Sequence, residues 1–246
     1  MFRAGQIDVG KFVTLHGAEV IESKDNWNFS RSFLFGYAIP FTHTGALATY
    51  AWTDWLSTTG GLVNGWDIVD DNNKAKTFLG NLTLGPWNNL TLSINPIYGA
   101  EQANNGHDQR GVLSNILSWM PNDQWAFMAN WDYGHEEDVI GGTDNSNWQG
   151  YALYARYSPL SWYSLANRVE WFNDQDGVRV APAGGAALAG SGHGDVAFFE
   201  WTLTNEFKLH EHIIARLEYR LDKADAEVFR QDQGAADYMN TFAAEL

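Results

Sequence analysis

Apolar and polar side chains alternate along most of this sequence with a period of two residues, and this alternation limits the fold more than any other feature. Residues 213–221 show it most clearly, with Leu217 and Leu221 on one face and Arg216 and Glu218 on the other. An amphipathic helix would instead need apolar residues every three to four positions. About a dozen such runs occur between turn-forming residues, so the sequence predicts an all-β protein with almost no helix.

The lengths of these runs and of their connections predict a membrane barrel. Each run is close to the ~9–11 residues that cross a bilayer as a tilted strand. Short connections near residues 53–55, 86–89, 121–123, 159–161 and 208–210 alternate with long ones near 14–44, 66–76, 99–110, 134–147, 173–194 and 222–237. Outer-membrane barrels combine short periplasmic turns with long extracellular loops. We therefore expect residues 1–246 to form a single domain, an antiparallel up-and-down transmembrane β-barrel of about 12 strands.

Tryptophan residues form two bands along the predicted strands. One band, at the short-turn end, comprises Trp55, Trp87, Trp125 and Trp162, and the other, toward the long loops, comprises Trp66, Trp131, Trp148 and Trp171. Indole rings favour the headgroup region of a bilayer, so we interpret the bands as interfacial girdles. The membrane-interface candidates are Trp55, Trp87, Trp125, Trp162 and Trp171. The alternative is a soluble β-sandwich whose core these rings cap at both ends, although a sandwich does not require such banding.

Composition excludes several classes of protein. The chain has 30 acidic and 15 basic residues, and this net charge of −15 argues against a nucleic-acid partner, because phosphate contacts need clustered Lys and Arg. The absence of cysteine excludes thiol catalysis, disulfides and cysteine-ligated metals. A disordered protein would not contain 15% aromatic residues. We expect no cofactor and no metal site, because the acidic run His135 to Asp138 lies in a predicted loop without the helical spacing of a zinc motif.

Distinctive motifs lie along nearly the whole chain. They are VGKFVTLHGAEVIE (9–22), NFSRSF (28–33), PFTHTG (40–45), NGWD (64–67), IYGAE (97–101), DYGHE (132–136), EWFNDQDG (170–177) and ARLEYR (215–220). With these motifs the sequence resembles a family of bacterial outer-membrane β-barrel porins described as porin-like or OmpL-like. The motifs are specific for fold and location, but they do not define a solute.

The resemblance implies an integral protein of the Gram-negative outer membrane, a porin-like channel for passive diffusion of small ions and polar solutes. Its implied surroundings are outer-membrane lipid and lipopolysaccharide, and formation of a homo-oligomer stays open. Family members look longer, with a signal peptide and further strands before the segment at Val9. Outer-membrane barrels also usually end on an aromatic residue, whereas this chain ends at Leu246. We therefore expect the natural protein to extend beyond both ends of this chain.

Alternation along the last predicted strands sends charged side chains of both signs toward the barrel interior. These pore-lining candidates are Arg156, Arg168, Glu170, Glu200, Arg216, Glu218 and Arg220. Neighbouring strands could pair these charges across the ladder, with bidentate Arg–carboxylate contacts in a shielded interior. Two interpretations stay open, a network that supports the barrel wall and one that sets ion and solute selectivity.

The first long connection, about 30 residues, carries the most distinctive family motif. We expect it to fold partly inward and to constrict the pore, which would bring Glu19, Glu22, Arg31 and His43 near the lumen. Aromatic residues at positions 27, 29, 33, 35 and 41 argue against disorder in this segment. Acidic residues cluster in the other long loops, where a solvated rim is one interpretation and attraction of cations to the pore mouth is another.

Two other classes of function remain as alternatives. Glu170, Glu200 and Glu218 could form the carboxylate pair of a carbohydrate-active β-protein, but each lies near an arginine, which lowers a carboxyl pKa instead of raising it toward general-acid duty. A non-conducting scaffold or binding barrel in the outer membrane is the second alternative. We expect a channel without catalytic residues.

Overall fold

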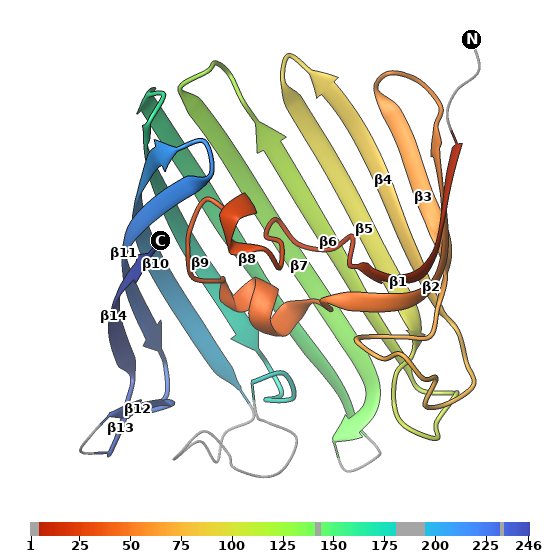
Figure 1. Cartoon of the computed structure of the whole chain (residues 1–246). Helices are drawn as coiled ribbons and strands as arrows, with labels where there is room; N and C mark the ends of the chain where they lie inside the picture. Colours follow the sequence, from red (N-terminus) through yellow and green to blue (C-terminus); the bar gives the residue numbers. More distant parts are fainter. Residues whose placement is uncertain (1–4, 141–143, 181–194, 232–233) are drawn as a thin grey trace.

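The computed structural model describes residues 5–140, 144–180, 195–231 and 234–246, most of which lie in one antiparallel sheet (Figure 1). Twelve strands follow one another in chain order, each paired with its sequence neighbour in the sheet. They are β1 (Gly5–Val13), β2 (Thr42–Ala51), β3 (Leu56–Val63), β4 (Thr77–Trp87), β5 (Leu90–Ala100), β6 (Gln109–Trp119), β7 (Trp125–Ile140), β8 (Asp144–Leu160), β9 (Tyr163–Asp174), β10 (Val196–His210), β11 (Ile213–Ala224) and β14 (Tyr238–Glu245). The predicted fold class, about twelve up-and-down antiparallel strands, is confirmed.

Short turns join the strands at one end of the sheet, close to the predicted positions. Between β4 and β5 the turn consists of Asn88 and Asn89, whose positive φ angles of 49° and 63° suit the right-handed twist of a hairpin. The predicted turn at 208–210 is wrong by a few residues, because β10 continues to His210 and the chain reverses at residues 211–212. The pairing of β10 with β11 is irregular between Lys208 and His210, so a search for a strict period of two does not detect this end of the strand.

Long connections lie at the opposite end, with one correction. The expected loop at 134–147 is mostly strand, because β7 and β8 pair beyond the other strands, with His135 opposite Asn147 and Ile140 opposite Asp144. Polar residues can continue this ladder because a hairpin that projects beyond the bilayer has water around it. Of the connection predicted at 173–194, residues 181–194 lie outside the described part of the chain. The last connection contains a small hairpin of β12 (Phe229–Gln231) and β13 (Gly234–Ala236).

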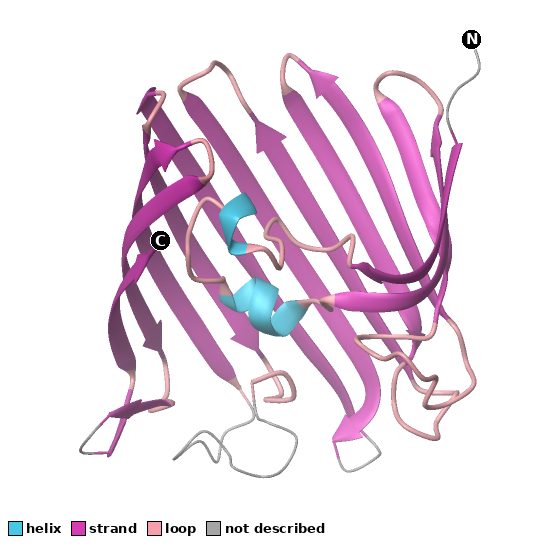
Figure 2. Ribbon diagram, in the orientation of Figure 1, coloured by secondary structure: helices cyan, strands magenta, loops and turns pink. Residues whose placement is uncertain are grey.

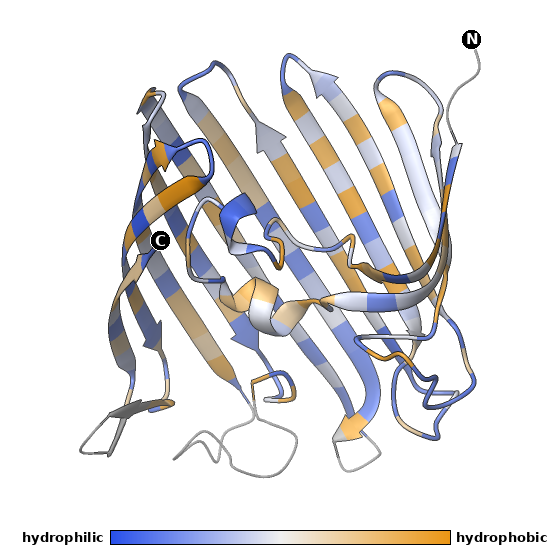
Figure 3. Ribbon diagram, viewed as in Figure 1, coloured by the Kyte–Doolittle hydropathy of each residue, from blue (hydrophilic) through white to orange (hydrophobic). Residues whose placement is uncertain are grey.

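The sheet is apolar on its outer face and polar on its inner face. Outward side chains include Ile7, Val9, Leu153 and Leu217, which are 76%, 79%, 59% and 57% exposed. The alternate positions of β9–β11 point inward and are buried. Figure 3 shows the resulting banding of hydropathy along the strands. This distribution is the reverse of a soluble sandwich and suits a strand wall with lipid outside. No described helix is long and apolar enough to cross a membrane.

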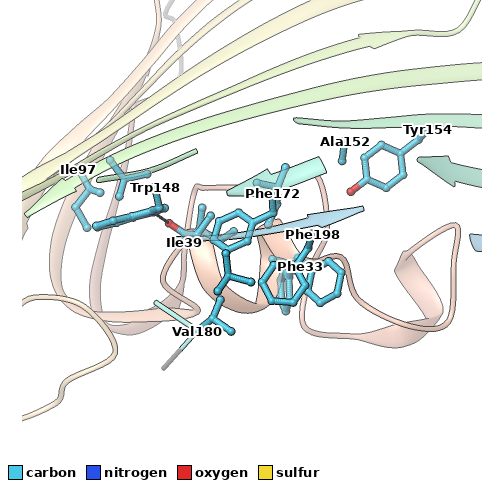
Figure 4. Packing of buried hydrophobic residues seen from close by; sticks show 14 of the residues in the cluster. Phe33, Ile39, Ile97, Trp148, Ala152, Tyr154, Phe172, Val180 and Phe198 are labelled. Carbon is cyan, nitrogen blue, oxygen red and sulfur yellow. Dashed lines mark hydrogen bonds between the residues drawn. The ribbon is translucent and has the colours of Figure 1, made fainter. Parts of the chain in front are cut away.

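Residues 14–41, between β1 and β2, lie across the concave face of the curved sheet (Figures 1 and 2). We call this segment the inserted loop. It contains a short 3-10 helix, η1 (Ser23–Asp25), and a π-helix, η2 (Leu34–Ala38). Its apolar residues Phe33, Leu34 and Ile39 pack against Phe172 and Phe198 of the strands (Figure 4). The hydrophobic core therefore lies between the inserted loop and the sheet.

The two predicted tryptophan bands are only partly found on the outer face. Trp55, Trp87, Trp125 and Trp162 at the short-turn end are 45%, 46%, 39% and 52% exposed. At the other end, Trp171 stacks on Tyr151 with ring centroids 5.2 Å apart.

Two members of the second band do not belong to the outer surface. Trp148 is fully buried, because its position on β8 has the inward parity, and Trp66 packs against the same core at an angle of 73° to Trp148. Gly134 on the neighbouring strand makes room for the Trp148 ring, since a Cβ at this glycine would lie 1.9 Å from Trp148 Cε2. The second band therefore contributes to packing of the interior as well as to the outer surface.

Candidate functional site

Inward side chains of β8–β11 form a charged wall that holds the inserted loop, defined here as Arg156, Arg168, Glu170, Glu200, Glu206, Arg216, Glu218 and Arg220. Arg168 is at its centre and is fully buried. Its Nη1 lies 2.5 Å from Glu19 Oε1 of the inserted loop, and its Nε lies 2.7 Å from Glu200 Oε2 on β10. Nη1 also donates to the Ser30 carbonyl at 2.8 Å. One guanidinium thus joins the loop to two strands through charge-assisted bonds.

Two carboxylates of the same wall bind the backbone of the inserted loop. Glu170 accepts hydrogen bonds from the amides of Phe33 and Leu34 at 2.7 and 2.5 Å, just where η2 begins. Glu218 accepts from the amides of Phe29 and Ser30 at 2.7 and 2.9 Å. A carboxylate suits these positions because consecutive backbone N–H groups present partial positive charge.

Arg216 binds carbonyl groups at both ends of η1. Its Nη1 donates to the Ser23 carbonyl at 2.9 Å and its Nη2 to the Asn26 carbonyl, also at 2.9 Å. The same guanidinium pairs with Glu206 and with Glu245 of β14 at 2.8 and 2.9 Å. Because both Arg216 and Glu206 are buried, the loop contacts satisfy donors that would otherwise be costly to bury.

Uncharged groups fasten the two ends of the inserted loop on the other strands. Near its start, the Gly17 amide donates to Ser114 Oγ at 3.1 Å and the Ala18 amide to Asn130 Oδ1 at 2.9 Å. Near its end, Trp148 Nε1 donates to the Ala38 carbonyl at 3.0 Å. The loop is therefore bonded to strands from β6 to β11.

The four residues predicted for the constriction have different environments. Glu19 lies at the centre, where its Oε2 also accepts from the Ser32 amide at 2.8 Å. Arg31 binds its own loop, with Nε and Nη2 donating to the carbonyls of Val20 and Ile21 at 3.0 and 2.7 Å. Glu22 is exposed, and His43 belongs to β2 instead of the loop, because pairing with β1 begins at Thr42.

Two histidines pack where the inserted loop leaves and rejoins the sheet. His43 is fully buried, and its ring nitrogens lie 2.9 Å from the Gly65 carbonyl and 3.1 Å from Thr14 Oγ1. His16 Nδ1 lies 3.3 Å from the same hydroxyl. Burial, with a smaller contribution from the neighbouring His43, lowers the pKa of His16 from 6.5 to about 3. His16 is therefore neutral over the physiological pH range.

The structure brings together all seven predicted pore-lining residues on the inner face of β8–β11. Most of their charged groups are bound to other groups of the protein. Arg156 pairs with Glu206 at 2.7 Å, and Arg220 binds Asp222 through Nε at 2.8 Å. Sequence reasoning missed Glu206 and Trp148 as contributors. The alternation of β10, which continues from Glu200 through Thr204 to residue 206, could have identified Glu206.

The inner face of β2–β5 is different. None of these four strands contains Asp, Glu, Lys or Arg. Their inward groups bond to each other: Thr49 Oγ1 lies 2.8 Å from Thr59 Oγ1, and Asn81 Nδ2 donates to Asn95 Oδ1 at 2.6 Å. We call eight of the inward hydroxyl and amide residues of these strands the uncharged wall: Thr49, Ser57, Thr59, Asn81, Thr83, Thr91, Ser93 and Asn95.

Comparison with known proteins agrees with this architecture. A family model described as "Putative beta-barrel porin-2, OmpL-like" matches residues 4–246. The structure of outer-membrane expressed OmpT of Vibrio cholerae is similar with a TM-score of 0.66 at 13% identity, over 98% of this chain and 75% of that chain. The loop L8 deletion mutant of this OmpT gives 0.63 at 11% identity, over 98% and 74%. At such identities the likeness concerns the fold alone. No curated protein matches the chain.

Proposed function

We propose that this chain, which belongs to the OmpL-like β-barrel porin family, is a channel for passive diffusion of small ions and small polar solutes. Its family and fold make it an integral protein of the outer membrane. The observation that supports a channel best is the inserted loop, bonded across the inner face of the sheet by Arg168, Glu170 and Glu218. A segment fixed in this position narrows the path for solutes without closing it by a movable lid.

A non-enzymatic role is part of the proposal. The carboxylates that could have served as a catalytic pair are engaged in holding the loop. Glu170 and Glu218 each accept two backbone amides, and Glu200 pairs with Arg168 and accepts the Thr202 hydroxyl. A general acid needs access to a substrate, and these carboxylates are buried against the groups that they bind.

Selectivity in this proposal depends on unpaired charges outside the charged wall. Most guanidinium groups of the wall lie against carboxylates, so their fields largely cancel for a passing ion. The connections at the long-loop end carry exposed acids such as Asp70, Asp225 and Glu227. Together with the net charge of −15, they favour a weak preference for cations at that mouth.

Single-channel recording in planar bilayers tests the proposal. Purified protein should give discrete conductance steps, and a salt gradient should give a reversal potential of the sign expected for cations. Replacing residues 18–36 by a short Gly-Ser linker should raise the conductance severalfold, because the inserted loop no longer fills the lumen. The matched control shortens the connection between β5 and β6 at the exposed residues Ala103 and Asn104, and should leave the conductance unchanged.

Two outcomes would contradict the proposal in different ways. Folded and inserted protein that gives no conductance steps would overturn the channel and favour a non-conducting scaffold. Conductance that stays the same after removal of residues 18–36 would leave the channel but overturn the constriction by the inserted loop.

A further inference from the structure

A cavity of about 530 Å³ lies on the inner face of the sheet, between the inserted loop and the short turns. The loop contributes Trp27. The strands contribute the hydroxyl groups of Thr91, Ser118 and Ser158 and the guanidinium of Arg156. The turns contribute the amide side chains of Asn89 and Asn122. The volume falls within the ~300–1,000 Å³ typical of small-molecule sites.

Trp27 is held in place by the residues on either side of it. Asn26 is buried and donates through Nδ2 to the Val20 carbonyl at 2.8 Å. Asn28 is buried and donates through Nδ2 to Thr204 Oγ1 on β10 at 2.7 Å. Trp27 itself is only partly buried and meets Tyr154 edge to face, with ring centroids 6.4 Å apart at 83°. The indole is thus preorganised at the cavity, which lowers the entropy cost of binding against it.

The charges that line the cavity nearly cancel. Arg156 and Asp123 are its two charged lining residues. Within the described part of the chain, both hydrogen bonds of Arg156 leave through Nη2, to Ser164 Oγ at 3.2 Å and Glu206 Oε1 at 2.7 Å. Nε and Nη1 are therefore left as donors, while the nearby carboxylate of Glu206 balances the positive charge. Such a site offers hydrogen bonds without a strong preference for either sign of ion.

We propose that this cavity is a binding subsite for an uncharged cyclic polyol, the chemistry of a mono- or disaccharide. Trp27 supplies an aromatic face for the apolar C–H face of a sugar ring, and Thr91, Ser118 and Arg156 supply hydrogen bonds to its hydroxyls. The uncharged wall extends the same chemistry along β4 and β5, where Thr83 and Ser93 hydroxyls lie 3.5 Å apart. This inference rests on the proposed channel function and assigns it a class of solute.

Blocking of single-channel current by sucrose, with sorbitol as an acyclic comparison, tests the inference. Sucrose should interrupt the current with longer residence times than sorbitol, because only the cyclic sugar presents a flat apolar face to Trp27. The cavity lies on the short-turn side of the inserted loop, so sucrose added from that side should block at a higher rate than sucrose added from the long-loop side.

Variants separate stacking from hydrogen bonding. Trp27→Ala should shorten the residence time of sucrose by about 3- to 10-fold, while Trp27→Phe keeps most of it. Thr91→Val removes a hydroxyl at constant shape and should shorten residence by about 2- to 5-fold without touching the loop. Trp131→Phe is the matched control, because Trp131 is 38% exposed on the outer face and lies away from the cavity.

The possible outcomes distinguish failure of the sugar subsite from failure of the proposed channel function. Absence of any conductance in inserted protein would overturn the proposed channel itself. A conducting channel that sucrose and sorbitol block equally, or whose sucrose block is unchanged in both Trp27→Ala and Thr91→Val, would overturn the sugar subsite alone. A shorter residence time of sucrose in Thr91→Val, with unchanged open-channel conductance, would support the sugar subsite even where Trp27→Ala alters the inserted loop.

Discussion

The two walls of the interior differ in charge and in what they contact. Strands β9–β11 each carry several charged residues at inward positions, and these bind the inserted loop through Arg168, Arg216 and Glu218. Strands β2–β5 contain no Asp, Glu, Lys or Arg, and hydroxyls such as Thr49 and Thr59 bond to each other.

This contrast indicates that the two parts of the sheet have different roles. Buried charges that are paired keep a segment in one position, because removing either partner leaves an uncompensated charge. Hydroxyl and amide groups can exchange one hydrogen-bond partner for another at little cost, which suits transient contact with a solute. The charged wall therefore fixes the path, and the uncharged wall is the surface that we expect a polar solute to meet. Arg168→Met and Thr83→Val test this division directly, and Gly134→Ala and His16→Asn test other contacts that hold the inserted loop.

The largest expected effect is from Arg168→Met. The change leaves Glu19 and Glu200 buried without their partner, and breaking a buried pair in this way costs about 3–5 kcal/mol. The free energy of unfolding, measured by urea titration in detergent micelles, should fall by that amount. Lys24→Met breaks an exposed ion pair in the same loop and should change it by less than about 0.5 kcal/mol. Equal effects of the two variants would contradict a special role of the charged wall.

Gly134→Ala should have the next largest effect. The added Cβ would overlap the Trp148 ring, which must move and lose its bond to the Ala38 carbonyl. We expect a loss of about 1–3 kcal/mol and a shift of the tryptophan fluorescence toward that of a solvated ring. Gly36→Ala is the matched control, since a Cβ there meets no atom within 4 Å. Unchanged fluorescence in Gly134→Ala would argue against Trp148 as an anchor of the inserted loop.

Acid should loosen the base of the inserted loop through His16. Its folded-state pKa of about 3 lies below the 6.5 of the unfolded chain, so neutral His16 contributes stability above pH 6.5 that is lost as the pH falls toward 3. The loss can reach about 1.4 kcal/mol per pH unit. Thermal unfolding at pH 7 and pH 4.5 should show a smaller decrease for His16→Asn than for the parent chain. An identical decrease would show that His16 does not titrate on unfolding.

The smallest effect is expected from Thr83→Val in the uncharged wall. Thr83 donates to Asn81 Oδ1 at 2.9 Å, and loss of one partly exposed hydroxyl should change the free energy of unfolding by less than about 1 kcal/mol. Loop position, judged by open-channel conductance, should stay the same. A loss comparable to that of Arg168→Met would remove the distinction between the two walls.

Much of the fold follows from local pattern alone. The period of two decided which residues point outward, as at Leu153 and Leu217, because successive side chains of a strand must lie on opposite faces. The same rule directed Arg168, Glu170 and Glu218 inward. It did not locate the end of β10 or the tall hairpin of β7 and β8, because a bulge and strand pairing outside the bilayer leave no regular signal.

By itself the sequence determined the strands, their order and the two faces of the sheet, since these depend on neighbours along the chain. Only the tertiary structure decided where the inserted loop lies and which groups hold it. Glu19 meets Arg168 across a separation of 149 residues, and Ala38 meets Trp148 across 110. Such contacts depend on the curvature of the whole sheet, which brings distant strands to the same segment. For the same reason Trp148, which resembles an interfacial residue in sequence, is an anchor in the interior.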